Sequence, residues 1–311
     1  MLKRKAFNRI FLTTVIFFLV FAFYSLNKVN NEIEYKKDDH KASEEVIYTL
    51  NKNNYVSKTS VYVSKMLTLE DKIKEKLEIM IDKNNKNSLL PSYFKPILPQ
   101  NTKVLDVVVE DSLVKVYFSK ELGNITKEQS EKMIEAIVYT ITNENILGVE
   151  IYVDGSMLRY VPHTKKELPT ILSKEIGINK SYEVSSQNDI TKVVMMYYAS
   201  ESDNYYEVPV TKYMNDKREK VEIIFDNLTG FNKNTDLINL FEGVKVNSYK
   251  ILSNKIIIDI NRELNDKEKN LLTKAIFLNY DVKKVEILVD GKKYFEKYEK
   301  GTWKYWIFIV Y

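Results

Sequence analysis

Histidines and carboxylates are the residues of this chain that could carry chemistry, because the sequence contains no cysteine. That absence excludes disulfides, thiol nucleophiles, thiolate metal sites and lipid attachment through cysteine. His40 and His163 stand far apart, and neither has the spacing of a metal ligand. The sequence has no glycine-rich phosphate loop and no Gly-x-Ser-x-Gly motif. We therefore expect two surface histidines.

Carboxylates occupy two pairs of equivalent positions. Glu121 and Glu263 precede expected helices, where a negative charge is favourable, although they could also make polar contacts at a strand end. Asp154 and Asp290 each precede a glycine, and Asp-Gly is common in hairpin turns because glycine accepts positive φ. We favour these structural interpretations. The sequence thus predicts a protein that is not an enzyme, with no cofactor and no catalytic, cofactor-binding or metal-binding residues.

The Asp-Gly pairs close a repeated segment. Val149–Gly155 returns 136 positions later as Val285–Gly291, and six of the seven residues are identical. A chain of 311 residues has room for about two domains. These observations indicate one fold that occurs twice in tandem.

Hydrophobic periodicity predicts the same order of elements in each repeat: strand, strand, helix, strand, strand, helix, strand. Strands are expected at 46–50, 60–65, 104–109, 113–119 and 149–153, and again at 193–198, 206–212, 246–252, 255–261 and 285–289. Capping-box spacing marks the second helix of each repeat, Thr126 with Gln129 and Asn265 with Glu268. The predicted fold class is α+β, with each repeat a two-layer α/β sandwich whose helices cover one face of a sheet.

Alternation along the expected strands defines the core of the first repeat. The inward positions are Val114, Val116, Phe118, Val149, Ile151 and Val153. Burying each such side chain contributes about 1.5–3 kcal/mol. We therefore expect Val153→Asp to unfold the first repeat.

Changes in composition set the expected domain boundaries. Residues 1–27 are expected to form a cytoplasmic tail and transmembrane anchor, 28–44 a polar tether, 45–163 the first domain, 164–189 a linker, 190–296 the second domain and 297–311 an aromatic C-terminal segment.

The net charge of +4 comes from the N-terminus. Lys3, Arg4, Lys5 and Arg9 precede the uncharged run Ile10–Leu26, and the rest of the chain has equal numbers of basic and acidic residues. A neutral body argues against a nucleic-acid partner. The run is 17 residues long, near the lower limit for a membrane-spanning helix, and the preceding positive charges favour a cytoplasmic N-terminus. We expect a single-pass cell-membrane protein with an extracytoplasmic body; a cleaved signal peptide is the alternative.

The aromatic C-terminal segment contains both tryptophans of the chain, within Trp303–Tyr311. Nine residues are too few to span a bilayer as a helix. Their composition favours a final strand that docks on the second domain. An edge that binds a partner or a membrane surface is the alternative.

The order of these motifs resembles the GerMN-domain family. Ala136–Gly155 resembles the end of that domain, a helix, a short loop and a strand ending in Val-Asp-Gly, and Val114–Leu122 resembles the strand before it. Ala275–Gly291 and Ile256–Leu264 supply a second copy, whose helix-to-strand connection is three residues shorter. The best-known family members with this tandem arrangement look like lipoproteins, anchored through a cysteine that this chain lacks.

The resemblance implies a domain fold similar to ring-building modules and a role in sporulation or spore germination. It implies a protein exposed between mother cell and forespore, where the family helps to assemble the channel complex, and it carries no catalytic residues. We expect a non-enzymatic, membrane-anchored scaffold that acts through protein–protein contacts with channel proteins or with further copies of itself. A peptidoglycan-binding module or a factor in spore cell-wall hydrolysis is the alternative.

Overall fold

The computed structural model describes residues 42–83, 89–201, 204–230 and 236–299. The expected transmembrane anchor, His40 and most of the aromatic C-terminal segment lie outside these residues. Within the described ranges, no helix is both long and apolar enough to cross a membrane. The chain from Ser43 onward belongs to one compact unit.

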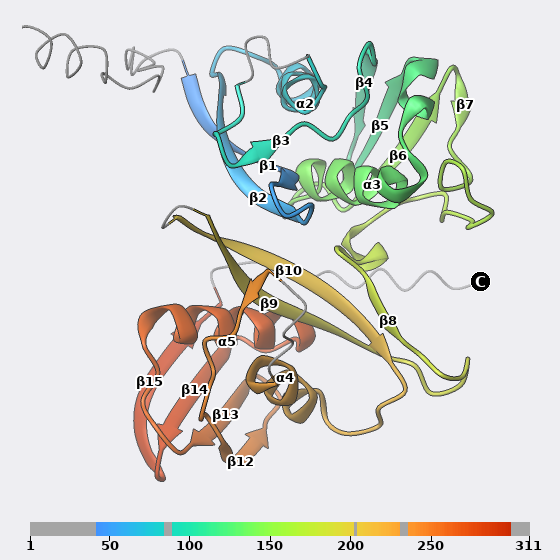
Figure 1. Ribbon diagram of the computed structural model, residues 1–311. Coiled ribbons are helices and arrows are strands. Elements are labelled where there is room, and N and C mark those ends of the chain that lie inside the picture. Colours follow the sequence, from blue (N-terminus) through green and yellow to red (C-terminus); the bar gives the residue numbers. More distant parts are fainter. Residues whose placement is uncertain (1–41, 84–88, 202–203, 231–235, 300–311) are drawn as a thin grey trace, which may run out of the picture. The chain divides into compact units, whose positions relative to one another are not determined.

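The first repeat folds into two sheets and two main helices (Figure 1). In chain order its elements are β1 (Ala42–Asn51), β2 (Val56–Ser64), α2 (Leu69–Ile79), β3 (Phe94–Lys95), β4 (Val104–Glu110), β5 (Leu113–Phe118), the 3₁₀ helix η1 (Lys120–Asn124), α3 (Lys127–Ile141), β6 (Gly148–Val153) and β7 (Ser156–Met157). The strand orders are β2-β1-β3 and β4-β5-β6-β7.

The second repeat has the same order of strands and α-helices, without a counterpart of η1 among its described residues. They are β9 (Thr191–Glu201), β10 (Asn204–Met214), α4 (Lys220–Thr229), β11 (Leu237–Ile238), β12 (Val246–Ile251), β13 (Lys255–Ile260), α5 (Asp266–Asn279), β14 (Lys284–Val289) and β15 (Lys292–Tyr298). Its strand orders are β11-β9-β10-β8 and β12-β13-β14-β15, where β8 (Ser181–Glu183) comes from the chain between the repeats. Strand β15 follows the second Asp-Gly pair and was not expected from the sequence.

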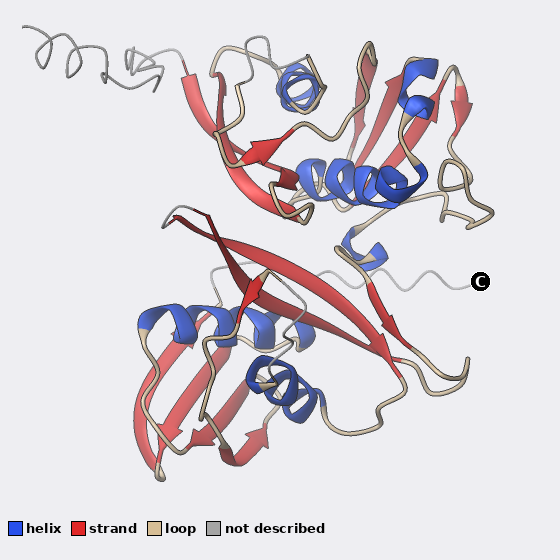
Figure 2. Ribbon diagram, viewed as in Figure 1, coloured by secondary structure: helices blue, strands red, loops and turns tan. Residues whose placement is uncertain are grey.

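The helices of each repeat lie between its two sheets, as the blue and red ribbons of Figure 2 show. Helix α3 packs against both β2 and β6, and α5 packs against both β9 and β14. The sequence predicted a two-layer sandwich, with the helices on one face of a single sheet. The structure has a third layer, because the first two strands of each repeat form a separate hairpin sheet. The physical reason is that α3 is apolar around much of its circumference and needs cover on two sides.

A parallel crossover forms the centre of each repeat. Strands β5 and β6 are parallel and joined by α3, and β13 and β14 are parallel and joined by α5. Of the expected inward residues, Val114, Val116, Phe118, Val149 and Ile151 are at most 2% exposed. Val153 is only half-buried, so Ile151 is the stronger core position on β6.

Each repeat has its own hydrophobic core. The first cluster of buried residues runs from Ile47 to Ile178, and the second from Val193 to Ile287. Apolar residues of α3 and α5 lie in these clusters, including Met133, Ile137 and Leu271. Tyr55 of the first repeat also packs against the second core.

The capping boxes differ from expectation. Thr126 is the N-cap residue of α3, but its side chain makes no capping hydrogen bond. Asn265 and Glu268 form a complete capping box on α5, with bonds of 3.0 and 2.7 Å. Spacing alone therefore did not identify which box forms.

The expected linker at 164–189 carries ordered structure. Leu172 forms two backbone hydrogen bonds of 2.8 Å with Val149 of β6. The 3₁₀ helix η2 (Lys174–Ile176) follows, and β8 then pairs in parallel with β10. The chain between the repeats thus adds a residue to one sheet edge and a strand to another sheet.

Candidate functional site

His163 has a structural role in a loop. It is exposed, has a φ of 60°, and its Nε2 lies 3.1 Å from the carbonyl oxygen of Gly123 in η1. Among the residues that the structure describes, no group of three or more His, Cys, Asp or Glu side chains could hold a metal ion.

Each of the four candidate carboxylates lies within its own repeat, and Glu263 lies in the loop before α5. Glu121 lies in the first turn of η1, and a hydrogen bond from Ser119 lowers the pKa of its carboxyl. Asp154 and Gly155 have φ values of 51° and 76°, and Asp290 and Gly291 have 48° and 77°. Both Asp-Gly pairs form the expected two-residue hairpin turns, after β6 and after β14. The same turn geometry therefore ends a core strand in each repeat.

A buried polar cluster lies between β2 and β10. Asn179 accepts a hydrogen bond from the N–H of Val56 and donates to the carbonyl oxygens of Val56 and Pro209, each at 2.8 Å. It is 6% exposed and has a φ of 46°, which Asn tolerates better than most residues. One side-chain amide therefore binds backbone groups of strands from both repeats.

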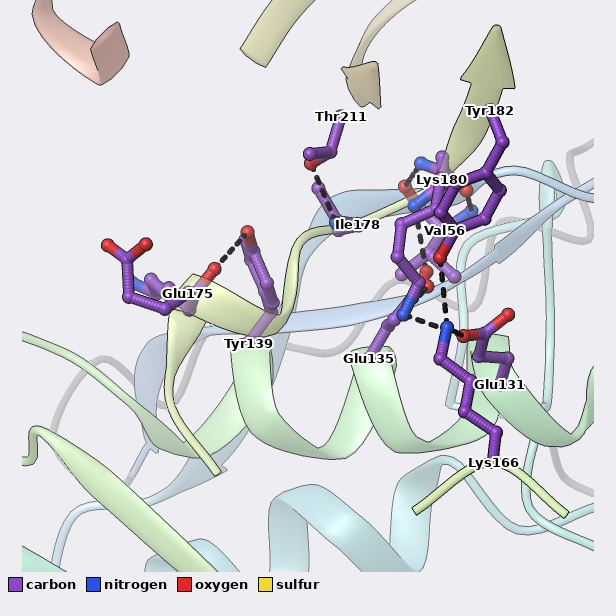
Figure 3. Close-up of polar contacts among 12 residues, drawn as sticks. Val56, Glu131, Glu135, Tyr139, Lys166, Glu175, Ile178, Lys180, Tyr182 and Thr211 are labelled. Carbon is purple, nitrogen blue, oxygen red and sulfur yellow. Dashed lines mark hydrogen bonds and ion pairs between the residues drawn. The ribbon is translucent and has the colours of Figure 1, made fainter. Parts of the chain in front are cut away.

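The backbone next to Asn179 also binds β10. The N–H of Ile178 donates to Thr211 Oγ1 at 2.9 Å, and the N–H of Thr211 donates to the carbonyl oxygen of Ile178 at 2.8 Å (Figure 3). Gly177 has a φ of 81°, and a Cβ atom there would lie 3.0–3.1 Å from the Thr211 side chain. Glycine thus permits both the backbone conformation and the close approach.

A charged group closes the other side of this cluster (Figure 3). Lys180 Nζ lies 3.1 Å from Glu135 and 3.0 Å from Glu131, both on α3. The side chains of Lys180 and Glu135 are 8% and 2% exposed. Glu135 also accepts the N–H of Asn179 at 2.8 Å, and Glu131 is shared with Lys166. The buried charges are therefore paired and hydrogen-bonded, which a low-dielectric interior requires.

The two glutamates have opposite pKa shifts. Burial raises the pKa of Glu135, and the attraction of Lys180 only partly opposes it. Burial also acts to raise the pKa of Glu131, but hydrogen bonds and attraction from Lys166 and Lys180 outweigh it and lower that pKa. Glu131 is thus the carboxylate better stabilised in its charged form.

Sequence reasoning did not identify this cluster. Its one signal was Glu135, a charged residue that interrupts the apolar run of α3 between Ile134 and Ala136. Lys180 lies 45 positions further on, and no spacing rule connects it to Glu135. Only the folded path of the connecting chain brings them together.

The outward faces of the sheets β4-β5-β6-β7 and β12-β13-β14-β15 differ. In the first repeat Tyr117 and Tyr152 stack across β5 and β6 with ring centroids 4.7 Å apart. Asp259 and Leu288 occupy the equivalent outward positions in the second repeat. Ion pairs cover that second face: Lys255 with Glu286 at 3.3 Å, Lys293 with Glu296 at 2.7 Å, and Lys284 with both glutamates.

These features define a class of protein with two α/β modules of one fold. A buried polar cluster joins the modules, and their outward sheet faces carry different side chains. A family model described as Germane, sporulation and spore germination, matches residues 40–159. Spore germination protein GerM of Bacillus subtilis (strain 168) is 29% identical over 277 residues, which cover 82% of this chain and 74% of that protein.

A solved structure supports the tandem arrangement. The tandem GerMN domains of the sporulation protein GerM from Bacillus subtilis match with a TM-score of 0.71 and 25% identity. The match covers 81% of this chain and 92% of that one. Residues 40–159 thus match the Germane family model, and over most of its length the chain is similar to GerM, a protein with two GerMN domains.

Proposed function

We propose that this chain is a non-enzymatic, membrane-anchored scaffold of sporulation or spore germination, which acts through protein–protein contacts of its tandem GerMN domains. Its place would be the channel complex between mother cell and forespore, and its partners would be channel proteins or further copies of the chain. The relationship to a sporulation protein with the same two domains supports this role.

The observation that carries the proposal is the different surface of two domains with one fold. The sheet β4-β5-β6-β7 presents the stacked Tyr117–Tyr152 pair beside one ion pair, Lys115–Glu110. The sheet β12-β13-β14-β15 presents the exposed Tyr298 and a network of ion pairs around Glu286 and Glu296. Aromatic side chains are enriched in protein interfaces, and charged rims favour selective association. Two dissimilar faces on one chain suit a scaffold that holds two different neighbours.

Photo-crosslinking in sporulating cells tests this role. A photoreactive amino acid replaces Tyr152 or Leu288 of the full chain, since these outward positions are equivalent in the two repeats. We expect protein adducts at both positions, with different partners. A third variant carries the same amino acid at Met66, an 86% exposed residue outside both sheets, and should give few adducts.

The adducts also separate the alternative functions. Adducts that contain only peptidoglycan fragments, at either sheet position, would contradict the scaffold and favour the wall-binding alternative. Adducts equal in yield and identity to those at Met66 would show that neither sheet face is an interface.

The proposed location has its own test. The anchor proposal places residues 1–27 in the cytoplasm and membrane and the two domains outside. Protease added to wall-stripped cells should then digest the domains and leave a cytoplasmic marker protein undigested, because the membrane protects the marker. Domains that remain protected with the marker would contradict this orientation.

A further inference from the structure

In both modules the chain, after the Asp-Gly turn, returns to the same residue of the last core strand. Leu172 lies beside Val149 of β6, joined by two backbone hydrogen bonds of 2.8 Å. Lys297 is paired with Val285 of β14. Because Val149 and Val285 are the same position of the repeat, Leu172 and Lys297 occupy equivalent places at the two sheet edges.

In the first module the following residues cover the end of α3. The hydroxyl of Tyr139 donates to the carbonyl oxygen of Lys174 at 3.1 Å, and the Lys174 ammonium lies 5.8 Å from the centre of the Tyr139 ring. Ile176 packs against the first core, and Ile178 is fully buried. The segment Ser173–Ile178 thus shields the last turn of the helix from water.

The second module leaves the equivalent surface open. Leu278 of α5 takes the position of Tyr139, counted from the matching alanines Ala136 and Ala275, and 45% of it is exposed. The two helices are anchored alike one residue later. Thr140 accepts the N–H of Tyr48 at 2.8 Å, and Asn279 accepts the N–H of Val194 at 2.9 Å. The helices therefore match in register, and the exposure of Leu278 reflects a missing cover.

The remaining chain is long enough and apolar enough to supply that cover. Twelve residues follow Glu299, and an extended chain of this length reaches about 40 Å. The whole of α5 is about 21 Å long for its 14 residues. Trp303 stands six residues after Lys297, as Ile178 stands six residues after Leu172. A large apolar side chain thus occurs at the equivalent point of both paths.

We propose that the aromatic segment Trp303–Tyr311 docks on the second module, over the C-terminal end of α5 around Leu278, as Ser173–Ile178 docks on α3. The segment is then a structural cover and leaves the outward sheet faces for partners. This inference does not depend on the proposed scaffold function.

Tryptophan fluorescence of the full-length chain tests the docking, because Trp303 and Trp306 are its only tryptophans. We expect blue-shifted emission that resists acrylamide quenching in the parent protein. Leu278→Glu should red-shift the emission and increase quenching several-fold. Leu105→Glu, at a 53% exposed leucine of the first module, is the matched control and should change neither property. Identical emission of the parent and Leu278→Glu would overturn the proposal, whether the segment is exposed or held by a membrane or micelle.

The absence of cysteine allows a second, independent measurement. Leu278→Cys combined with Trp303→Cys or Tyr305→Cys should give an intramolecular crosslink with a short bismaleimide. Met66→Cys with the same partner should not. Dimers crosslinked between chains, or equal yields in both combinations, would contradict docking within one chain.

Discussion

At the scale of single residues, the buried ion pair of Glu135 and Lys180 carries a desolvation cost. Glu135 and Lys180 are almost completely enclosed, and each depends on the other and on neighbouring hydrogen bonds. Such a pair adds little net stability compared with apolar residues, but loss of one member leaves the other uncompensated. The residue that makes the arrangement specific is Asn179, whose amide binds three backbone groups.

Asn179→Ala should lower the free energy of unfolding by about 2–4 kcal/mol, because it leaves three buried backbone groups without their side-chain partner. Urea titration measures the effect. Asn101→Ala is the control, since Asn101 has a similar φ of 62° but is exposed. An equal loss in both variants would assign the effect to the backbone conformation instead.

Lys180→Met should cost about 3–5 kcal/mol near neutral pH, because Glu135 then stays buried without its cation. Burial already raises the pKa of Glu135, and removal of Lys180 raises it further. The folded protein therefore takes up a proton at a higher pH than the unfolded chain does. The deficit should shrink as the pH falls through that raised pKa toward the ordinary value of about 4.3.

The control for this pair is an exposed one. Lys217 pairs with Asp189 at 2.8 Å with both side chains more than half exposed, so Lys217→Met should change stability by less than about 0.5 kcal/mol. A Lys180→Met deficit that does not vary with pH would argue against an ionised, buried Glu135.

At the scale of elements, each domain uses the same central unit with different local support. Helices α3 and α5 both connect parallel strands and both bind the first hairpin strand through a polar side chain in the last turn. Their N-termini differ, because α5 has a complete capping box and α3 has none. The strands that follow them, β6 and β14, have the same pattern of burial except at the first residue.

Asn265→Ala should destabilise the second domain by about 1 kcal/mol, because it removes the hydrogen bond to the N–H of Glu268. Thr126→Ala at the equivalent place should cost less than about 0.5 kcal/mol, since Thr126 makes no capping bond. Thermal unfolding of the two variants compares the costs. Equal costs would show that the capping bonds do not differ in solution.

Ile151→Asp should cost more than about 3 kcal/mol and unfold the first domain, because it buries a carboxylate at a position that is 2% exposed. Val153→Asp, two residues further along β6, should be milder because Val153 is half-buried. Circular dichroism and urea titration of both variants test this order. A larger effect of Val153→Asp would restore the expectation that the sequence suggested.

At the scale of the whole molecule, separate cores are linked by contacts that are few but specific. Besides the polar cluster, Phe94 and Tyr206 bring their ring centroids to 5.7 Å, and Tyr55 packs against the second core. A tandem protein with such a junction can transmit stability from one domain to the other.

We therefore expect one calorimetric unfolding transition in the parent chain and two in the double variant Gly177→Ala/Asn179→Ala. This variant strains the close approach to Thr211 and removes the amide bonds, while both cores keep their residues. Two transitions in the parent chain would show that the junction does not couple the domains.

The sequence by itself determined the repeat, the strands and helices of each core, and the Asp-Gly turns. These features depend on periodicity and on local backbone preference, which are written into neighbouring residues. Val114, Val116 and Phe118, for example, had to share one face of any strand they formed.

Only the tertiary structure decided the second sheet over the helices and the meeting of Glu135, Asn179 and Lys180 with β2 and β10. Neither follows from local pattern, because the partners are separated by tens to more than a hundred residues. Chain connectivity and the need to pair every buried charge and amide select that arrangement. The same physics explains why a segment that looked like a linker became the most specific contact between the domains.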